Sequence, residues 1–265
     1  MPDPYVSQRR VLITGAAGGL GSALASEFVS QGWKVALCDV DRDAVAAFAG
    51  RLKERGGDVL STGCDVTVES ELIKLRELCE AEWGGLDVLI NNAGIASMAA
   101  IHKEPMERWQ RLIDINLLGV VRGCHSFVPL FKKQGGGHIV NIASIAGIAN
   151  TPFMAAYNAT KAAVISVSET LLVELAPSNI GVTVVCPAMF KTGIAQRAPI
   201  DNPKLRRALE AEMAKSPISA EDIAEQVFSA VQRKQFLVIP HRASRWQYRV
   251  KRLSPGLYRR IFLKH

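Results

Sequence analysis

Short apolar segments alternate with longer amphipathic segments along most of the chain. The short segments are rich in β-branched residues and predict strands at residues 11–13, 35–38, 59–64, 88–90, 139–142, 182–185 and 236–239. Between them, apolar residues recur at helical spacing over residues 20–31, 42–55, 68–82, 105–131 and 155–175. Because each return to a parallel strand needs a crossover, this alternation predicts a doubly wound α/β domain with about seven parallel strands and helices on both faces.

The alternating pattern continues without a linker or an internal repeat, which predicts one domain over residues 1–240. It becomes irregular after Val185, where prolines interrupt it at Pro187, Pro199, Pro203 and Pro217. Long irregular connections inside a compact domain are usually functional or disordered. We therefore expect this segment to fold over the functional site as a mobile flap.

Residues 241–265 form a basic tail of different composition. They contain eight Lys and Arg residues and no carboxylate, and since the whole chain carries a net charge of +7, residues 1–240 carry −1. Apolar side chains are interleaved with the cations: Trp246, Tyr248, Leu253, Leu257, Tyr258, Ile261, Phe262 and Leu263. This mixture is typical of segments that lie on an anionic membrane, and Pro255-Gly256 predicts a break into two pieces. The alternatives are that the tail packs on the body or on a neighbouring subunit, or is disordered. We expect no nucleic-acid partner, because no recognition motif accompanies the charge.

Cysteine usage and the N-terminal sequence bear on the cellular compartment. The five cysteines are odd in number and far apart in sequence, which is typical of buried thiols in a reducing compartment. The N-terminus lacks the charged start and the apolar run of a secretory signal. Residues 134–160 contain no Asp, Glu, Lys or Arg, but glycines, asparagines and a proline interrupt them, so they predict a buried strand, loop and helix. We expect a cytoplasmic protein, peripherally attached to a membrane if the tail binds lipid. We expect no metal site, because His102, His125 and His138 are scattered.

A glycine-rich turn, Thr14 to Gly21, joins the first predicted strand to the first predicted helix. Glycines at such a turn let the backbone approach a pyrophosphate, and the helix N-terminus offers unpaired N–H groups to the phosphates. A glycine-rich turn without a ligand is the alternative. The position at the first strand-to-helix junction favours a dinucleotide site.

The second predicted strand ends at Asp39, eighteen residues beyond Gly21. A carboxylate at this point can accept hydrogen bonds from the hydroxyls of the adenosine ribose and repels a 2′-phosphate. Arg42 lies three residues later and could turn towards a phosphate, although a solvated residue in the first helical turn is the simpler interpretation. The sequence therefore predicts NAD, with NADP less favoured.

Tyr157 and Lys161 are four residues apart in a predicted helix and so share one face. An ammonium group near a phenol stabilises the phenolate and lowers the tyrosine pKa, which makes the phenol usable as an acid or a base near neutrality. Ser144 follows the fifth predicted strand, where ligands sit in open α/β sheets, and its hydroxyl can hydrogen-bond a carbonyl oxygen. Taken alone, the tyrosine and lysine pair is a weak signal, and a serine in a turn is usually structural.

Taken together, these residues resemble the short-chain dehydrogenase/reductase family over roughly residues 8–240. Thr14 to Gly21 matches the family's TGxxxGxG loop, Asn91-Asn92-Ala93-Gly94 its NNAG signature, and Cys64-Asp65-Val66 the segment that contacts adenine. Asn116, Ser144, Tyr157 and Lys161 have the order and spacing of its catalytic residues. The resemblance implies a Rossmann-like fold and a nicotinamide cofactor held by Gly15, Gly19, Leu20, Gly21, Asp39, Asp65, Val66, Asn92, Ala93, Gly94, Tyr157, Lys161, Pro187 and Thr192.

The resemblance also implies a role for each catalytic residue. Tyr157 would exchange a proton with the substrate oxygen, and Ser144 would orient that oxygen. Lys161 would hold the nicotinamide ribose and lower the pKa of Tyr157. Asn116 would kink its helix and hold a water molecule of a proton relay. The chain departs from the family in having Pro187-Ala188 where Pro-Gly is common.

By position in the family fold, an apolar set of residues would face the substrate: Ile95, Met98, Ile145, Phe153, Met154, Met189, Phe190 and Ile194. This set predicts a lipophilic secondary alcohol or ketone, because a sugar or keto-acid site needs more polar partners. The resemblance further implies a homodimer or homotetramer assembled through residues 105–131 and 155–175. Two other functions stay open: a non-catalytic dinucleotide sensor and an NADP-dependent reductase of acyl-carrier substrates.

Overall fold

A computed structural model of the protein describes residues 8–191, 198–200 and 202–262. Its centre is a seven-stranded sheet in the order β3-β2-β1-β4-β5-β6-β7, in which all neighbouring strands are parallel. The strands are β1 (Arg10–Thr14), β2 (Lys34–Asp39), β3 (Val59–Gly63), β4 (Val88–Asn91), β5 (Gly137–Ile142), β6 (Ile180–Val185) and β7 (Leu237–Val238). The predicted doubly wound α/β fold is confirmed.

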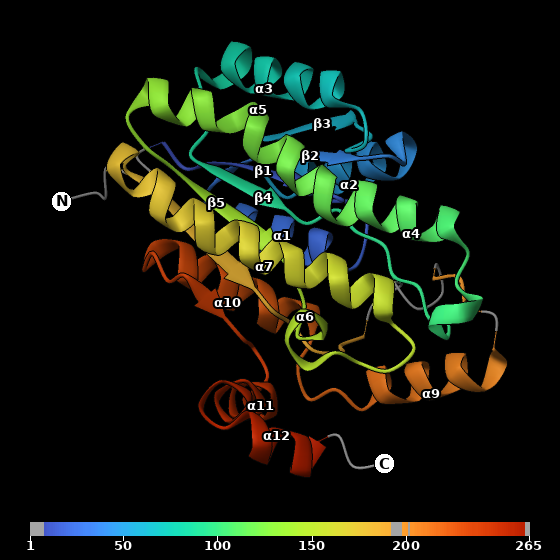
Figure 1. Cartoon of the computed structure of the whole chain (residues 1–265). Coiled ribbons are helices and arrows are strands. Elements are labelled where there is room, and N and C mark those ends of the chain that lie inside the picture. Colours follow the sequence, from blue (N-terminus) through green and yellow to red (C-terminus); the bar gives the residue numbers. More distant parts are fainter. Residues whose placement is uncertain (1–7, 192–197, 201, 263–265) are drawn as a thin grey trace.

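Helices cover both faces of this sheet (Figure 1). One face carries α1 (Gly19–Ser30), α2 (Arg42–Glu54) and α10 (Ala220–Gln232), and the other carries α3 (Glu69–Trp83), α5 (Gly119–Gln134) and α7 (Ala155–Leu175). Successive strand side chains point to opposite faces, so Val11 and Ile13 of β1 pack in the first core and Leu12 packs in the second. The near-continuous apolar strands of the sequence therefore reflect two hydrophobic cores.

The strand order places a crevice beside β1. The chain moves outward from β1 to β3 and then returns to β4 on the other side of β1. The direction of the strand order therefore reverses at β1. Helices that follow the strands on the two sides of this reversal cover opposite faces, which leaves a crevice at the carboxyl ends of the strands. Thr14 ends β1 and Asn91 ends β4 at this edge.

Two parts of the helical pattern differ from the prediction. The segment after Val185, which its prolines made irregular in the sequence pattern, contains two helices, α9 (Pro203–Ala214) and α10. Asn202 caps α9 and a Ser219–Asp222 capping box begins α10. The predicted helix at residues 105–131 consists of α4 (Met106–Ile113), a π-helical turn (Asp114–Leu118) and α5.

The basic tail forms two helices, α11 (Arg242–Leu253) and α12 (Pro255–Phe262), as its Pro-Gly pair predicted. In Figure 1 they lie below the body, next to the short helix α6 (Ala146–Ala149). Within the part of the chain that the structure describes, no helix is both long and apolar enough to cross a bilayer. All five cysteines are buried and unpaired, as expected.

Candidate active site

A cavity of about 950 Å³ opens at the carboxyl ends of the central strands. It brings together most of the residues that the sequence predicted: Gly15, Gly19, Leu20, Asp39, Asp65, Val66, Asn92, Ala93, Gly94, Ser144, Tyr157, Lys161 and Pro187. Gly21 and Asn116 are not in its wall but support residues that are. Thr192 lies outside the described residues.

The glycine loop at the start of α1 forms one end of the cavity. Gly15 and Gly19 have positive φ angles of 65° and 53°, which glycine adopts without strain. A β-carbon on Gly21 would lie 2.2 Å from the carbonyl oxygen of Gly15, so only glycine allows this close approach. Gly18 precedes α1 and provides no side-chain cap for its first N–H groups. A shallow backbone cradle in front of a helix N-terminus fits a diphosphate.

Asn92 holds this cradle against β4. Its amide nitrogen donates to the carbonyl oxygens of Thr14 and Gly15, at 2.9 and 3.0 Å. The Thr14 hydroxyl accepts in turn from the backbone N–H groups of Asn92 and Ala93, both at 3.0 Å. Asn92 therefore acts mainly by fixing the position of the glycine loop.

Asp39 lies at the end of β2, with its carboxylate beside the glycine loop. It accepts from the backbone N–H of Ala17 at 2.9 Å and from that of Asp41 at 3.1 Å. Arg42 lies along β3, where a β-carbon on Gly63 would be 2.8 Å from its Nε. Among the described residues, Arg42 is not part of the cavity wall, whereas Asp39 is. A negative charge therefore borders this end of the cavity.

Ser144, Tyr157 and Lys161 meet on the opposite wall. The Ser144 hydroxyl donates to the Pro187 carbonyl oxygen at 3.4 Å and accepts from the backbone N–H of Ala146 at 3.1 Å. Lys161 Nζ lies 5.8 Å from the centre of the Tyr157 ring and donates to the Ile142 carbonyl oxygen at 2.8 Å. The spacing of four residues on α7 thus brings the phenol and the amine into one cavity.

The pKa of Tyr157 differs from the prediction. Burial raises the pKa of Tyr157, and the nearby Ser144 hydroxyl opposes this shift only in part. Burial also lowers the pKa of Lys161 to about 8, because a buried ammonium loses its hydration. The net shift of the Tyr157 pKa is therefore upward, opposite to the lowering that the sequence predicted.

Asn116 lies in the π-helical turn between α4 and α5 and is fully buried. Its Oδ1 accepts from the Ile95 N–H at 2.8 Å, and its Nδ2 donates to the Ile95 carbonyl at 2.9 Å and to Thr160 Oγ1 at 3.2 Å. A β-carbon on Gly94 would lie 3.2 Å from Asn116 Oδ1 and 3.5 Å from Lys161 Nζ. Asn116 therefore fixes the loop beside Lys161, and its predicted interruption of the helix takes the form of a π turn. Its role in holding a water molecule stays a prediction.

The residues predicted to face a substrate give the cavity part of its apolar lining. Of the predicted residues, Ile95, Ile145, Met154, Met189 and Phe190 line it, whereas Met98 and Phe153 do not and Ile194 lies outside the described residues. Sequence reasoning missed Ala198 and, on α9, Leu209 and Met213. The spacing of Leu205, Leu209 and Met213 behind an Asn-Pro helix start was the signal that could have found them.

Comparison with known proteins assigns the chain to a family. The family model for short chain dehydrogenase matches residues 9–202. The chain belongs to the short-chain dehydrogenase family. An uncharacterized oxidoreductase of Staphylococcus saprophyticus is 35% identical over 69% of this chain and 79% of its own length. The chain spans 41% of a longer relative, the probable oxidoreductase EphD of Mycobacterium tuberculosis.

Two solved structures of the family are similar to the whole fold. A short-chain dehydrogenase/reductase from Burkholderia phymatum in complex with NAD is 30% identical, with a TM-score of 0.87 and coverage of 93% of this chain and 94% of that one. A short-chain dehydrogenase from Sphingobium yanoikuyae in complex with NADPH is 32% identical, with a TM-score of 0.77 and coverage of 93% of both chains. Fold and family together support a nicotinamide-dinucleotide-dependent oxidoreductase.

Proposed function

We propose that the protein interconverts a lipophilic secondary alcohol and the corresponding ketone, with NAD preferred to NADP and Tyr157 as the general acid/base. The observation that carries this proposal is the meeting of Ser144, Tyr157 and Lys161 in the same cavity as the glycine loop. A protein that only senses a dinucleotide has no need of such a proton-transferring group.

The residues of the cavity fit the dinucleotide at both ends. The glycine loop and the N-terminus of α1 would hold its diphosphate, and Asp39 its adenosine ribose. Gly94 and Lys161 lie at the other end, where the nicotinamide ribose would bind. The bound cofactor supplies the hydride chemistry, and the protein supplies position and proton transfer. The carboxylate of Asp39 is the reason for proposing NAD, since it would repel a 2′-phosphate.

Ser144, Tyr157 and Lys161 would carry out the proton transfer. Ser144 and Tyr157 both line the cavity, so a substrate oxygen placed between their hydroxyls would be held and protonated in one position. Lys161 contributes positive charge next to the phenol when it is protonated, which favours the phenolate. The Ile142 carbonyl and the Asn116 turn keep Lys161 and its neighbouring loop in place.

The wall beyond Tyr157 supports a lipophilic substrate. Ile145, Met154, Met189, Leu209 and Met213 supply apolar surface there. The methionines adapt their shape to bulky apolar ligands, and a wall of this kind offers few fixed partners for a polyol.

We also keep the assembly of two or four chains as a proposal. It rests on apolar side chains that α5 and α7 leave exposed, with Val173 74%, Val121 38% and Leu172 37% exposed. Sedimentation velocity of the purified protein gives the number of chains directly.

Replacement of Tyr157 by Phe tests the function. The variant keeps the ring and its packing but loses the exchangeable proton. We expect unchanged NAD binding by calorimetry, while oxidation of a panel of hydrophobic secondary alcohols, followed at the absorbance of the reduced nicotinamide, falls by roughly 10²- to 10⁴-fold. Turnover that survives the substitution would remove Tyr157 from the mechanism. Turnover that is absent from the unmodified protein with every alcohol and ketone tested would contradict the proposed reaction.

A further inference from the structure

The basic tail presents one side to the body and leaves the other uncovered. Ser244 of α11 and Tyr258 of α12 face the body, with 5% and 4% of their surface exposed. Arg242, Trp246, Arg249 and Leu253 are spaced by three and four residues and so share the opposite side of α11. All four are exposed. The tail is therefore amphipathic: one side packs on the body, and the other side, which mixes cations with apolar groups, is largely exposed.

The uncovered side contains large apolar groups that join across the two helices. Trp246 is 52% exposed, Leu253 86%, Leu257 47% and Ile261 40%. The Trp246 ring packs against the Phe262 ring with their centres 5.3 Å apart, so the apolar surface of α11 continues onto α12. Single exposed apolar residues are common, but a continuous group rimmed by charges marks an interaction surface. We call this group, with its arginines, the tail surface; it comprises Arg242, Trp246, Arg249, Leu253, Leu257 and Ile261.

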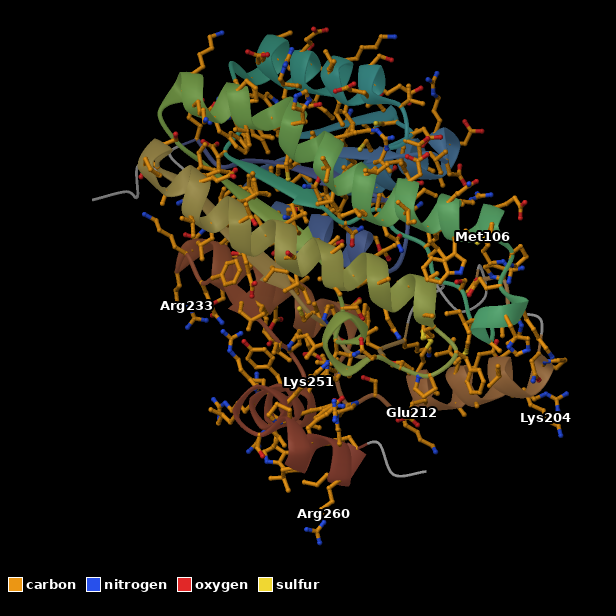
Figure 2. The ribbon with its side chains drawn as sticks, in the orientation of Figure 1. Met106, Lys204, Glu212, Arg233, Lys251 and Arg260 are labelled. Atoms are coloured by element: carbon orange, nitrogen blue, oxygen red, sulfur yellow. The ribbon has the colours of Figure 1, made fainter. Side chains whose placement is uncertain are left out.

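The charges around the tail surface have one sign. Residues 241–262 include seven Lys and Arg side chains and no carboxylate. Within the described residues, no carboxylate forms an ion pair with any of them. Figure 2 shows Arg260 directed away from the body. Arg245 and Arg249 also line a hollow of about 590 Å³ together with Arg233 of the body and one carboxylate, Glu225, which extends the basic surface to α10.

We propose that the tail surface binds a membrane that contains anionic lipids. Arginines can pair with lipid phosphates and carboxylates, while tryptophan and leucine side chains enter the boundary between headgroups and acyl chains. This partner matches both the charge and the apolar groups. A second copy of the same surface would bring cations against cations, and a soluble polyanion would leave Trp246 and Leu253 in water.

Vesicle flotation of the full-length protein tests the proposal. The vesicles contain phosphatidylcholine alone or with roughly 30 mol% phosphatidylserine. We expect flotation with the anionic vesicles, little with the neutral ones, and release as the salt is raised from about 0.1 M. Substitutions are preferable to truncation, because Tyr258 and Lys251 also hydrogen-bond to α6 and removal of the tail would disturb the body.

Two triple variants with the same loss of charge separate a surface effect from a change in net charge. Arg242→Gln, Arg249→Gln and Arg260→Gln should weaken partition into the anionic vesicles by roughly 100-fold. Arg51→Gln, Lys53→Gln and Arg55→Gln remove three exposed cations on and just after α2 and should leave partition nearly unchanged. Leu253→Ser should weaken partition without changing the charge, and circular dichroism checks that each variant is folded.

Three outcomes would overturn the proposal. The first is no flotation of the unmodified protein with anionic vesicles, and the second is an equal loss of partition in the two triple variants. Sedimentation velocity gives the third: self-association that the Arg242, Arg249 and Arg260 substitutions abolish, without vesicle binding, would assign the tail surface to a second copy of the chain.

Discussion

The hydroxyl of Tyr258 donates a hydrogen bond to the carbonyl oxygen of Ala149, 3.0 Å away across 109 residues of sequence. Ala149 ends α6, the short helix that begins two residues after Ser144. Lys251 Nζ donates to the neighbouring carbonyl of Ile148. The tail therefore supplies donors for the carbonyl groups at the end of α6, which a helix cannot satisfy itself. Through α6 the tail is mechanically connected to the loop that holds Ser144.

Replacing Tyr258 by Phe should lower both stability and turnover. The Ala149 carbonyl would lose its donor in a partly buried place, which costs about 1 kcal/mol and shifts the melting temperature by roughly 2–4 °C. We expect kcat to fall by about 2- to 10-fold, because the Ser144 loop becomes less fixed. Tyr248→Phe is the matched control. Among the described residues, the Tyr248 hydroxyl takes part in one solvent-exposed hydrogen bond, which it accepts from Arg252. Equal kcat values in the two variants would show that the tail does not position the catalytic loop.

Replacing Gly21 by Ala should damage the cofactor cradle. The new β-carbon would lie 2.2 Å from the Gly15 carbonyl oxygen, so the loop must move. We expect NAD affinity, measured by calorimetry, to fall by roughly 100-fold or more, since the loop can no longer approach a diphosphate. Gly50→Ala is the control: nothing lies within 4 Å of its β-carbon inside α2, and it should stabilise the protein by about 0.5–1 kcal/mol. If Gly21→Ala leaves NAD affinity intact, the cradle is not where the diphosphate binds.

The buried amine of Lys161 should make stability depend on alkaline pH. Burial lowers its pKa from 10.5 to about 8. Between these values the unfolded chain binds the proton that the folded protein has released, so the free energy of unfolding rises with pH. From pH 8 to about pH 10 the gain from this residue should be about 2 kcal/mol, and below pH 8 it is absent. Urea unfolding of the cofactor-free protein and of Lys161→Met at several pH values measures the difference. Parallel pH profiles for the two proteins would mean that Lys161 keeps its ordinary pKa.

The sequence predicted the sheet and most of the site because both depend on local signals. Apolar runs located the strands, and the fixed spacing of Tyr157 and Lys161 placed them on one face of a helix. The contribution of α9 was missed, because whether Leu209 faces the cavity or solvent depends on tertiary packing that spacing does not specify. The pKa of Tyr157 was predicted in the wrong direction for the same kind of reason: burial is a property of the assembled cavity, and its size relative to one nearby charge is visible only there.

The carboxylate of Asp39 should decide between NAD and NADP. It is fixed by the N–H groups of Ala17 and Asp41, so it cannot swing away from a 2′-phosphate without losing these bonds. We expect the unmodified protein to bind NAD more tightly than NADP, and Asp39→Asn to shift the ratio of the two affinities towards NADP by roughly 10- to 100-fold, because repulsion from a dianion is removed. Asp41→Asn removes a nearby charge that caps α2 through Ala44 at 3.0 Å and should shift the ratio much less. Tighter binding of NADP than of NAD by the unmodified protein would contradict the proposed preference, whereas an equal shift in both variants would assign the effect to general charge.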